Sequence, residues 1–227
     1  MDSFFTSNLF RKTVAALSGL FLVLFLIGHL LGNLQLFIPS ELGQTRFNKY
    51  ALFMTTNPAV NILSILTYSS IIVHILLTLY LAIKSRRARP IQYAVSSGNA
   101  NSSWSSKNMT LLGIFIFFFI VIHMKSFWYK MHFGDMPYQH LNDGTKIKDL
   151  YQVTVNAFSD PLYTFFYVFS MVILYFHLKH GIESAIQTLG LKTGSYIKIF
   201  KYISMVIAVF IPGLFASIPI FLFIKQL

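Results

Sequence analysis

The sequence contains no cysteine, and this absence excludes several kinds of site at once. Disulfide bonds, thiolate zinc sites, iron–sulfur ligation within the chain and cysteine nucleophiles all require a thiol. A metal ion could therefore be held only by histidine or by oxygen ligands. The sequence also lacks the glycine fingerprint of a dinucleotide-binding fold.

Charged residues are scarce as well. They make up 11% of the 227 residues, whereas average soluble proteins carry roughly 25%. Hydrophobic residues make up 55%, and the mean hydropathy is +0.63. This balance indicates an integral membrane protein. The net charge of +11 would suggest nucleic-acid binding in a soluble protein, but here the basic residues flank apolar segments, where they set topology.

Long apolar runs predict five transmembrane helices, because a helix needs about 20 apolar residues to cross the hydrocarbon layer. We place them near residues 11–38, 59–84, 108–131, 161–188 and 197–224. The first run is longer than a signal-peptide core of roughly 7–15 residues, so we interpret it as a retained helix. No internal repeat or second domain is visible, and we expect one transmembrane domain over residues 1–227.

The ends of the predicted helices carry start and stop signals. Asn57 precedes Pro58, and Asp160 precedes Pro161, so each pair predicts an N-cap followed by proline at the first helical position. Two prolines inside the fifth run, Pro212 and Pro219, predict a kinked helix. The other expected end signals are Pro39 for the first helix, Ser106 for the third and Ser195 for the fifth.

The basic residues predict the orientation of these helices. The N-terminal side carries eleven Lys and Arg residues and two acidic residues, which leaves +9. The other side carries seven basic and five acidic residues, which leaves +2. By the positive-inside rule the N-terminus lies inside and the C-terminus outside. Residues 83–107 form the clearest inner loop, and residues 131–152 form the longest outer loop.

Four histidines mark the predicted helices. His29, His74, His123 and His177 lie one each in the first four runs, and the fifth run has none. An ionisable ring in hydrocarbon needs a partner, and for any single histidine an interhelical hydrogen bond is the simpler interpretation. One histidine from each of four helices, however, is typical of a bundle that holds two haems between paired axial imidazoles. The expected fold class is therefore an all-α integral membrane protein of five helices, the first four forming a dihaem-binding bundle.

Depth along the helices sorts the histidines into pairs. His29 lies about 18 residues, roughly 27 Å, from the inner end of its helix, and His123 lies about 15 residues, roughly 22 Å, from the inner end of its own. His74 lies only about 10 residues, roughly 15 Å, from the inner end, and His177 stands two residues before Lys179. We predict an outer haem on His29 and His123, an inner haem on His74 and His177, and an electron path across the membrane.

Small and cationic residues near these histidines are further candidates. Gly28, Gly32 and Gly181 could let a flat macrocycle approach the helix backbone, although ordinary helix packing would explain them equally well. Lys179 and His180 could bind haem propionates, although a solvated helix end explains them too.

Three stretches carry a family resemblance: HLLGNLQLF from His29, FNKYALFMTTNP before the second run, and FHLKHGIESAIQTLGL around His177. The chain resembles, over essentially its whole length, the five-helix, two-haem cytochrome b subunit of bacterial succinate:quinone oxidoreductases, the succinate dehydrogenases and fumarate reductases. The resemblance implies four axial ligands, which fall on His29, His74, His123 and His177. In HLKHG either histidine could serve, and the distance from the ligand to the LG of QTLG in related sequences favours His177 over His180.

The resemblance also implies partners and a location. The chain would anchor a flavoprotein subunit with covalent FAD and an iron–sulfur subunit on the inner face of the bacterial cytoplasmic membrane. Electrons would pass between the iron–sulfur protein, two haems b and a quinone, commonly menaquinone in this family. Either direction is compatible, succinate oxidation or fumarate reduction. We expect no succinate chemistry from this chain alone, because it has neither a dinucleotide-binding glycine fingerprint nor a soluble domain that could hold a dicarboxylate. Tyr175 stands where some members of the family carry an acidic residue, and Glu183 is the only acidic residue near the inner half of the fourth helix. The sequence therefore does not support a proton path through that helix that relies on a membrane carboxylate at this position.

A quinone site needs hydrogen-bond donors beside an apolar slot. The candidates near the outer end of the first run are Asn33, Gln35, Asn48 and Lys49. Polar residues that anchor helix ends at the interface would look the same.

Two other functions stay open. The first is the membrane cytochrome b of a formate dehydrogenase or hydrogenase, in which one helix tends to supply two ligands. The second is a transporter without haem, whose histidines are structural.

Overall fold

The computed structural model describes residues 7–38, 40–88, 103–194 and 196–227. Five helices within these ranges are long and apolar enough to cross a membrane: Asn8–Phe37, Pro58–Arg87, Trp104–Phe133, Pro161–Thr188 and Tyr196–Ile224. The prediction of five helices with the length and composition of membrane spans is confirmed. The fourth span begins and ends where the sequence predicted, at residues 161 and 188.

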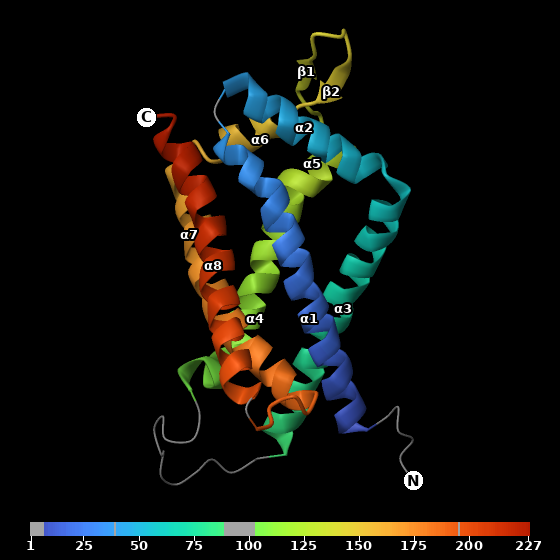
Figure 1. The fold of residues 1–227 in the computed structure, drawn as a ribbon, viewed down its shortest axis with the longest axis vertical. Helices are drawn as coiled ribbons and strands as arrows, with labels where there is room; N and C mark the ends of the chain where they lie inside the picture. The colour runs from blue at the N-terminus through green and yellow to red at the C-terminus, as the bar shows by residue number, and fades with distance from the viewer. Residues whose placement is uncertain (1–6, 39, 89–102, 195) are drawn as a thin grey trace. The chain divides into compact units, whose positions relative to one another are not determined.

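These spans are built from the following labelled elements (Figure 1). The first is α1 (Asn8–Asn33) with a 3₁₀ turn, η2 (Leu34–Phe37), and the second is α3 (Pro58–Arg87). The third joins α4 (Trp104–His123), a π-helical turn, η3 (Met124–Tyr129), and α5 (Lys130–Phe133). The last two are α7 (Pro161–Thr188) and α8 (Tyr196–Ile224).

Two of the predicted N-caps are confirmed. The Asn57 Oδ1 atom accepts the backbone N–H of Ala59 at 2.9 Å, and α3 begins at Pro58. The Asp160 Oδ1 atom accepts the backbone N–H of Leu162 at 2.8 Å, and α7 begins at Pro161. Both caps are local patterns, which explains why the sequence alone could locate them.

The other predicted end signals have different outcomes. The prediction for Ser106 is wrong: α4 begins at Trp104, and the hydroxyl of Ser103 accepts the N–H of Ser106 at 3.3 Å. Several neighbouring serines could cap this helix, so the sequence could not select one. Pro39, Ser195 and the part of the inner loop from 89 to 102 lie outside the described residues. Pro212 and Pro219 lie inside α8, and the kink they predict stays a prediction.

The chain divides into two compact units, and each draws on all five spans. Unit 1 comprises Met1–Phe25, Leu66–Ile114 and Leu174–Val209. Unit 2 comprises Leu26–Ile65, Phe115–Ile173 and Phe210–Leu227. Neither unit is a continuous stretch of sequence.

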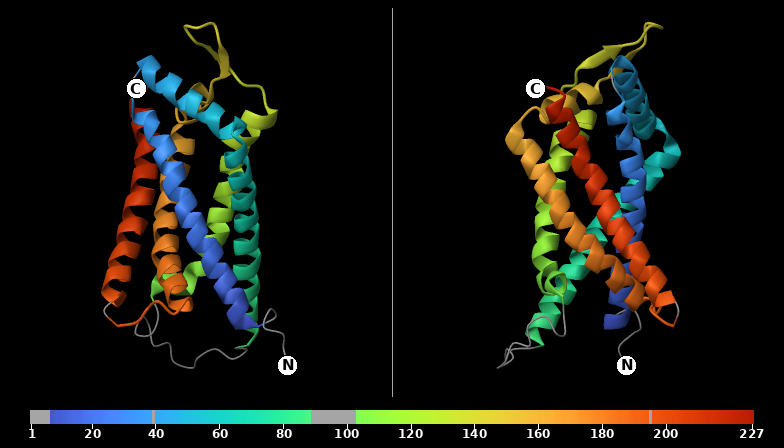
Figure 2. Two further views of the ribbon diagram at one scale, coloured as in Figure 1. Left: turned by 45° about the vertical axis from the view of Figure 1, so that its right-hand side comes forward. Right: turned by 60° about the vertical axis from the view of Figure 1, so that its left-hand side comes forward.

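Unit 2 contains folded structure in the segments that the sequence analysis treated as outer loops. Helix α2 (Ser40–Thr56) and helix α6 (Leu150–Ala157) contact each other, and α2 also contacts the second strand of an antiparallel hairpin, β1 (Tyr138–His140) and β2 (Lys146–Lys148). Figure 2 shows α2, α6 and the hairpin close together in both views. The fold is thus helical with one small hairpin. The hairpin turn contains an Asp143–Gly144 pair with Gly144 at φ +82°, a hairpin signal that the sequence analysis did not use.

A buried polar network joins these segments. Asn48 is fully buried, and its amide nitrogen donates to Gln139 Oε1 at 3.0 Å and to Asp149 Oδ1 at 2.8 Å. Its carbonyl oxygen accepts the backbone N–H of Tyr151 at 2.9 Å. Asp149 also caps α6 by accepting the N–H of Gln152 at 2.9 Å. The network therefore ties α2 to the hairpin and to the start of α6.

Candidate functional site

The first pair of histidines lies in unit 2. His29 of α1 and His123 at the end of α4 have ring centroids 5.8 Å apart and ring planes at 88°. Aromatic rings surround them: Phe215 of α8 lies 5.7 Å from His29, and Phe119 and Phe127 lie 5.8 and 5.4 Å from His123. The pair therefore stands in an apolar, aromatic environment.

The backbone beside His123 is unusual. His123 is the last residue of α4, and the π-helical turn Met124–Tyr129 follows immediately. Single π turns inside α-helices occur often at functional sites, because the extra residue re-aims the side chains around it. The sequence analysis had no signal for this turn.

A tyrosine holds one nitrogen of the His123 ring. The Tyr167 hydroxyl lies 3.3 Å from His123 Nδ1 and 2.9 Å from the hydroxyl of Tyr163, one turn earlier on α7. Tyr167 is buried. A contact at Nδ1 leaves Nε2 as the ring nitrogen for another partner. The sequence analysis did not single out either tyrosine.

The second pair lies in unit 1. His74 of α3 and His177 of α7 have ring centroids 6.4 Å apart and ring planes at 74°. His74 Nδ1 lies 3.1 Å from the backbone oxygen of Ala15 and 3.4 Å from the hydroxyl of Ser18, both on α1. The Nδ1 contact to a backbone carbonyl fixes the ring orientation and again leaves Nε2 for another partner.

Gly19 allows α1 to approach His74 this closely. A Cβ atom at Gly19 would lie 2.9 Å from His74 Cε1, which is closer than real Cβ contacts. A Cβ at Gly113 of α4 would lie 3.8 Å from His177 Cε1, an ordinary contact distance. Among the described residues, Gly19 and Gly113 are the glycines whose added Cβ would lie within 4 Å of a histidine ring. Neither was named from the sequence.

The three glycines named from the sequence have other surroundings. A Cβ at Gly32 would overlap the ring of Tyr50, so this glycine serves helix packing. A Cβ at Gly181 would lie 3.5 Å from the Met109 methyl group, and a Cβ at Gly28 would meet nothing within 4 Å among the described residues. Burial raises the pKa of the Tyr50 hydroxyl.

His177 carries a buried nitrogen that needs an explanation. Among the described residues, no donor or acceptor forms a hydrogen bond with His177 Nδ1, although the atom is buried. Leaving such a group unpaired costs about 1–3 kcal/mol. Unsatisfied buried groups are rare in native proteins and are often associated with a functional role or with a bound group.

The geometry of both pairs can be compared with what a haem requires. A metal–nitrogen bond is about 2.0–2.1 Å and the ring centroid lies about 1 Å further, so two imidazoles on opposite sides of one ion have centroids about 6 Å apart. The observed 5.8 and 6.4 Å fit this value. No group of three or more His, Asp or Glu residues within the described ranges could hold a bare metal ion. Two histidines per pair would be enough to hold a haem, whose porphyrin would supply the remaining nitrogens, and the distance within each pair is compatible with this.

The candidate propionate residues lie on α7. Lys179 and His180 are both half-buried. The Lys179 ammonium lies 5.9 Å from the centroid of the Tyr175 ring, and His180 interacts electrostatically with Glu183. Each therefore has a neighbour on its own helix.

The four quinone candidates differ in how their polar groups are used. Asn33 Nδ2 donates to the backbone oxygen of His29 at 2.8 Å, and Gln35 Nε2 donates to that of Gly32 at 3.2 Å. Both N–H groups of Asn48 are used in the buried network described above. The exposed Lys49 lines a cavity of about 210 Å³ with Glu41, Thr45, His140, Leu141, Asn142 and Asp143.

The fold and these sites define a helical protein with five candidate membrane spans and two close histidine pairs. Comparison of the chain with protein-family models, with curated proteins and with solved structures found no match.

Proposed function

We propose that this protein is the dihaem cytochrome b subunit of a succinate:quinone oxidoreductase in the bacterial cytoplasmic membrane. The observation that carries the proposal is the grouping of four histidines into two pairs, His29 with His123 and His74 with His177, at ring distances that suit a shared ion. The same pairs follow from depth along the predicted spans. That these residues ligate iron stays a prediction.

In this proposal the chain holds and orients the imidazoles. Ala15 and Ser18 hold the His74 ring at its Nδ1 edge, and Tyr167 does the same for His123. Such outer contacts set the tautomer and orientation of a metal-binding histidine. When bound, two haems b would supply one-electron redox centres on a path across the membrane.

The proposed partners follow from the family resemblance. A flavoprotein subunit with FAD and an iron–sulfur subunit would dock on the inner side. The net charge of +9 on that side is compatible with the docking of these subunits, and the positive-inside rule explains it equally well. Lys179 and His180 are the proposed propionate contacts. Asn33, Gln35 and Lys49 stay in the proposed quinone set, with menaquinone as the expected quinone, whereas Asn48 is engaged in the buried network.

A visible spectrum and a redox titration of the purified protein test the proposal. We expect a low-spin bis-histidine spectrum and two haems b per chain. His29→Ala should remove or destabilise the outer haem while succinate still reduces the inner one through the partner subunits. His74→Ala should slow the reduction of any remaining haem. The exposed His140 of the hairpin offers a control, and His140→Ala should keep both haems.

Three outcomes would contradict the proposal. Absence of a Soret band would favour the transporter alternative, and two ligands mapped to one helix would favour a formate dehydrogenase or hydrogenase cytochrome. Selective loss of the succinate-reducible inner haem in the His29 variant would show that the pairing is wrong.

A further inference from the structure

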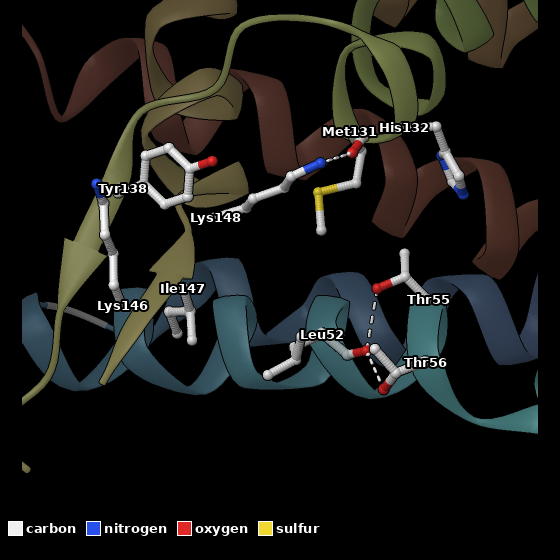
Figure 3. Close-up of a pocket in the computed structure, with 9 residues that line it drawn as sticks. All are labelled: Leu52, Thr55, Thr56, Met131, His132, Tyr138, Lys146, Ile147 and Lys148. Atoms are coloured by element: carbon white, nitrogen blue, oxygen red, sulfur yellow. Dashed lines mark hydrogen bonds between the residues drawn. The ribbon is translucent and has the colours of Figure 1, made fainter. Parts of the chain in front are cut away.

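A second cavity in unit 2 has a composition that the proposed electron-transfer function does not explain. It has a volume of about 350 Å³ and is lined by residues of α2, α5 and the hairpin. Figure 3 shows these side chains, which are Leu52, Thr55, Thr56, Met131, His132, Tyr138, Lys146, Ile147 and Lys148. We call it the hairpin pocket.

The hairpin pocket combines an apolar floor with a cationic rim. Met131 and Ile147 are buried, and Leu52 lines the pocket beside Ile147 (Figure 3). Lys146 and Lys148 lie on β2, and the exposed His132 lies on α5. The nine described lining residues include no Asp or Glu. The pocket therefore favours an anionic group next to an apolar body.

The two lysines are held in place without a carboxylate. The Lys148 ammonium donates to the backbone oxygen of Met131 at 2.6 Å, which leaves two of its three N–H groups for a ligand. The Lys146 ammonium lies 4.2 Å from the centroid of the Tyr138 ring, a cation–π contact that keeps its charge at the rim. Neither contact neutralises the positive charge.

The residues that line the pocket lie near the end of one candidate span and the beginning of another. Met131 and His132 are among the last residues of the span Trp104–Phe133, and Thr56 lies just before the span that begins at Pro58. The boundary between hydrocarbon and polar headgroups must lie near such ends. Large apolar side chains near these two span ends are exposed, Phe133 at 69% and Ile62 at 71%, and these would face acyl chains.

We propose that the hairpin pocket binds the phosphate of an anionic phospholipid headgroup, with the Lys148 ammonium as its hydrogen-bonding ligand and the Lys146 ammonium, beyond the Tyr138 ring (Figure 3), as a second positive charge at the rim. Clusters of basic residues at a membrane surface attract anionic lipids, and the apolar floor receives the start of the acyl chains. Ammonium groups also donate to quinone carbonyls, but a net positive charge with no Asp or Glu among the described lining residues stabilises an anion more than a neutral ring. The inference depends on the membrane location and not on haem or on succinate.

Native mass spectrometry of the purified full-length protein, with any co-purifying subunits, tests this site. The probes are phosphatidylglycerol and phosphatidylcholine added to the detergent-solubilised protein. We expect preferential retention of phosphatidylglycerol and about fivefold weaker binding in Lys146→Gln, since a basic residue near a membrane surface contributes about that factor. Lys148→Gln should weaken binding similarly, but Lys146→Gln is the cleaner variant because the Lys146 ammonium makes no hydrogen bond to the backbone.

The control removes an equal charge elsewhere in unit 2. Lys225 is exposed after the end of α8 and does not line the pocket, so Lys225→Gln should bind phosphatidylglycerol as the unchanged protein does. The proposal is overturned if Lys146→Gln and Lys225→Gln behave alike, or if phosphatidylcholine binds equally well. It is also overturned if millimolar inorganic phosphate displaces the lipid completely, which would indicate a site for soluble phosphate. Displacement by a menaquinone analogue alone would assign the pocket to quinone instead.

Discussion

At the residue scale, the environment of His74 depends on the absence of a Cβ atom at Gly19 of α1. Gly19 presents no Cβ to the imidazole, so the helix backbone comes close enough for Ala15 to contact His74 Nδ1 through its carbonyl oxygen. Ser18 adds its hydroxyl to the same nitrogen. One segment of α1 thus supplies both the room and the polar contacts that orient this histidine.

This arrangement predicts that Gly19→Ala is disruptive. The added methyl group would lie 2.9 Å from His74 Cε1, so the ring or the helix must move. Overpacking of this kind costs about 1–3 kcal/mol, and we expect a lower thermal unfolding temperature in detergent together with an altered spectrum of the proposed inner haem. Gly213→Ala on α8 is the control, because this exposed glycine is not among the haem candidates and its methyl group would meet nothing within 4 Å among the described residues. Equal behaviour of the two variants would contradict the prediction.

At the scale of elements, the segments between the long helices of unit 2 are organised by polar contacts. Asn48 on α2 and Asp149 before α6 are far apart in the sequence, yet their side chains are buried and bonded at 2.8 Å. Gln44 donates to the other carboxylate oxygen of Asp149 at 2.5 Å. The carboxylate is thus satisfied by two residues of α2 and by the first turn of α6, which explains how a charged group is buried at low cost.

Removal of Asn48 should loosen these segments. In Asn48→Ala, Gln139 Oε1 and the backbone N–H of Tyr151 lose the partner that Asn48 supplied, which costs about 1–3 kcal/mol per group left unsatisfied. Asp149 keeps its bonds from Gln44 and Gln152. We expect faster limited proteolysis between residues 134 and 149 and a lower unfolding temperature. Asn142→Ala, in the exposed hairpin turn, removes an amide without a buried partner and should match the unchanged protein. Equal proteolysis of the two variants would show that the network does not stabilise the region.

At the scale of the whole molecule, the topology follows from the odd number of candidate spans: five crossings would put the residues before α1 and those after α8 on opposite sides of a membrane. The charge difference, +9 against +2, predicts that the N-terminal side is inside. On this topology α2, α6, the hairpin and the hairpin pocket all belong to outer connections.

The absence of native cysteine makes this orientation simple to measure. Single cysteines can be placed at the exposed Asn142, in the hairpin turn, and at the exposed Thr193, between α7 and α8. A membrane-impermeant maleimide added to intact spheroplasts should label Asn142→Cys and should label Thr193→Cys only after lysis. The reverse pattern would invert the topology and move the proposed docking face to the other side.

The sequence by itself determined the five spans and the caps at Asn57 and Asp160, because hydrophobic length and N-capping are set by neighbouring residues. It also assigned one histidine to each of the first four spans and, by depth, the same two pairs whose rings lie close in the structure. Only the tertiary structure decided what surrounds those rings. The π turn after His123 is a feature of the backbone, which no residue pattern indicated. Gly19 and Tyr167 contact histidines that are distant in the sequence, so no periodicity could reveal these contacts. The same holds for α2, the hairpin and α6, since the contacts that order them join Asn48 to residues about a hundred positions away.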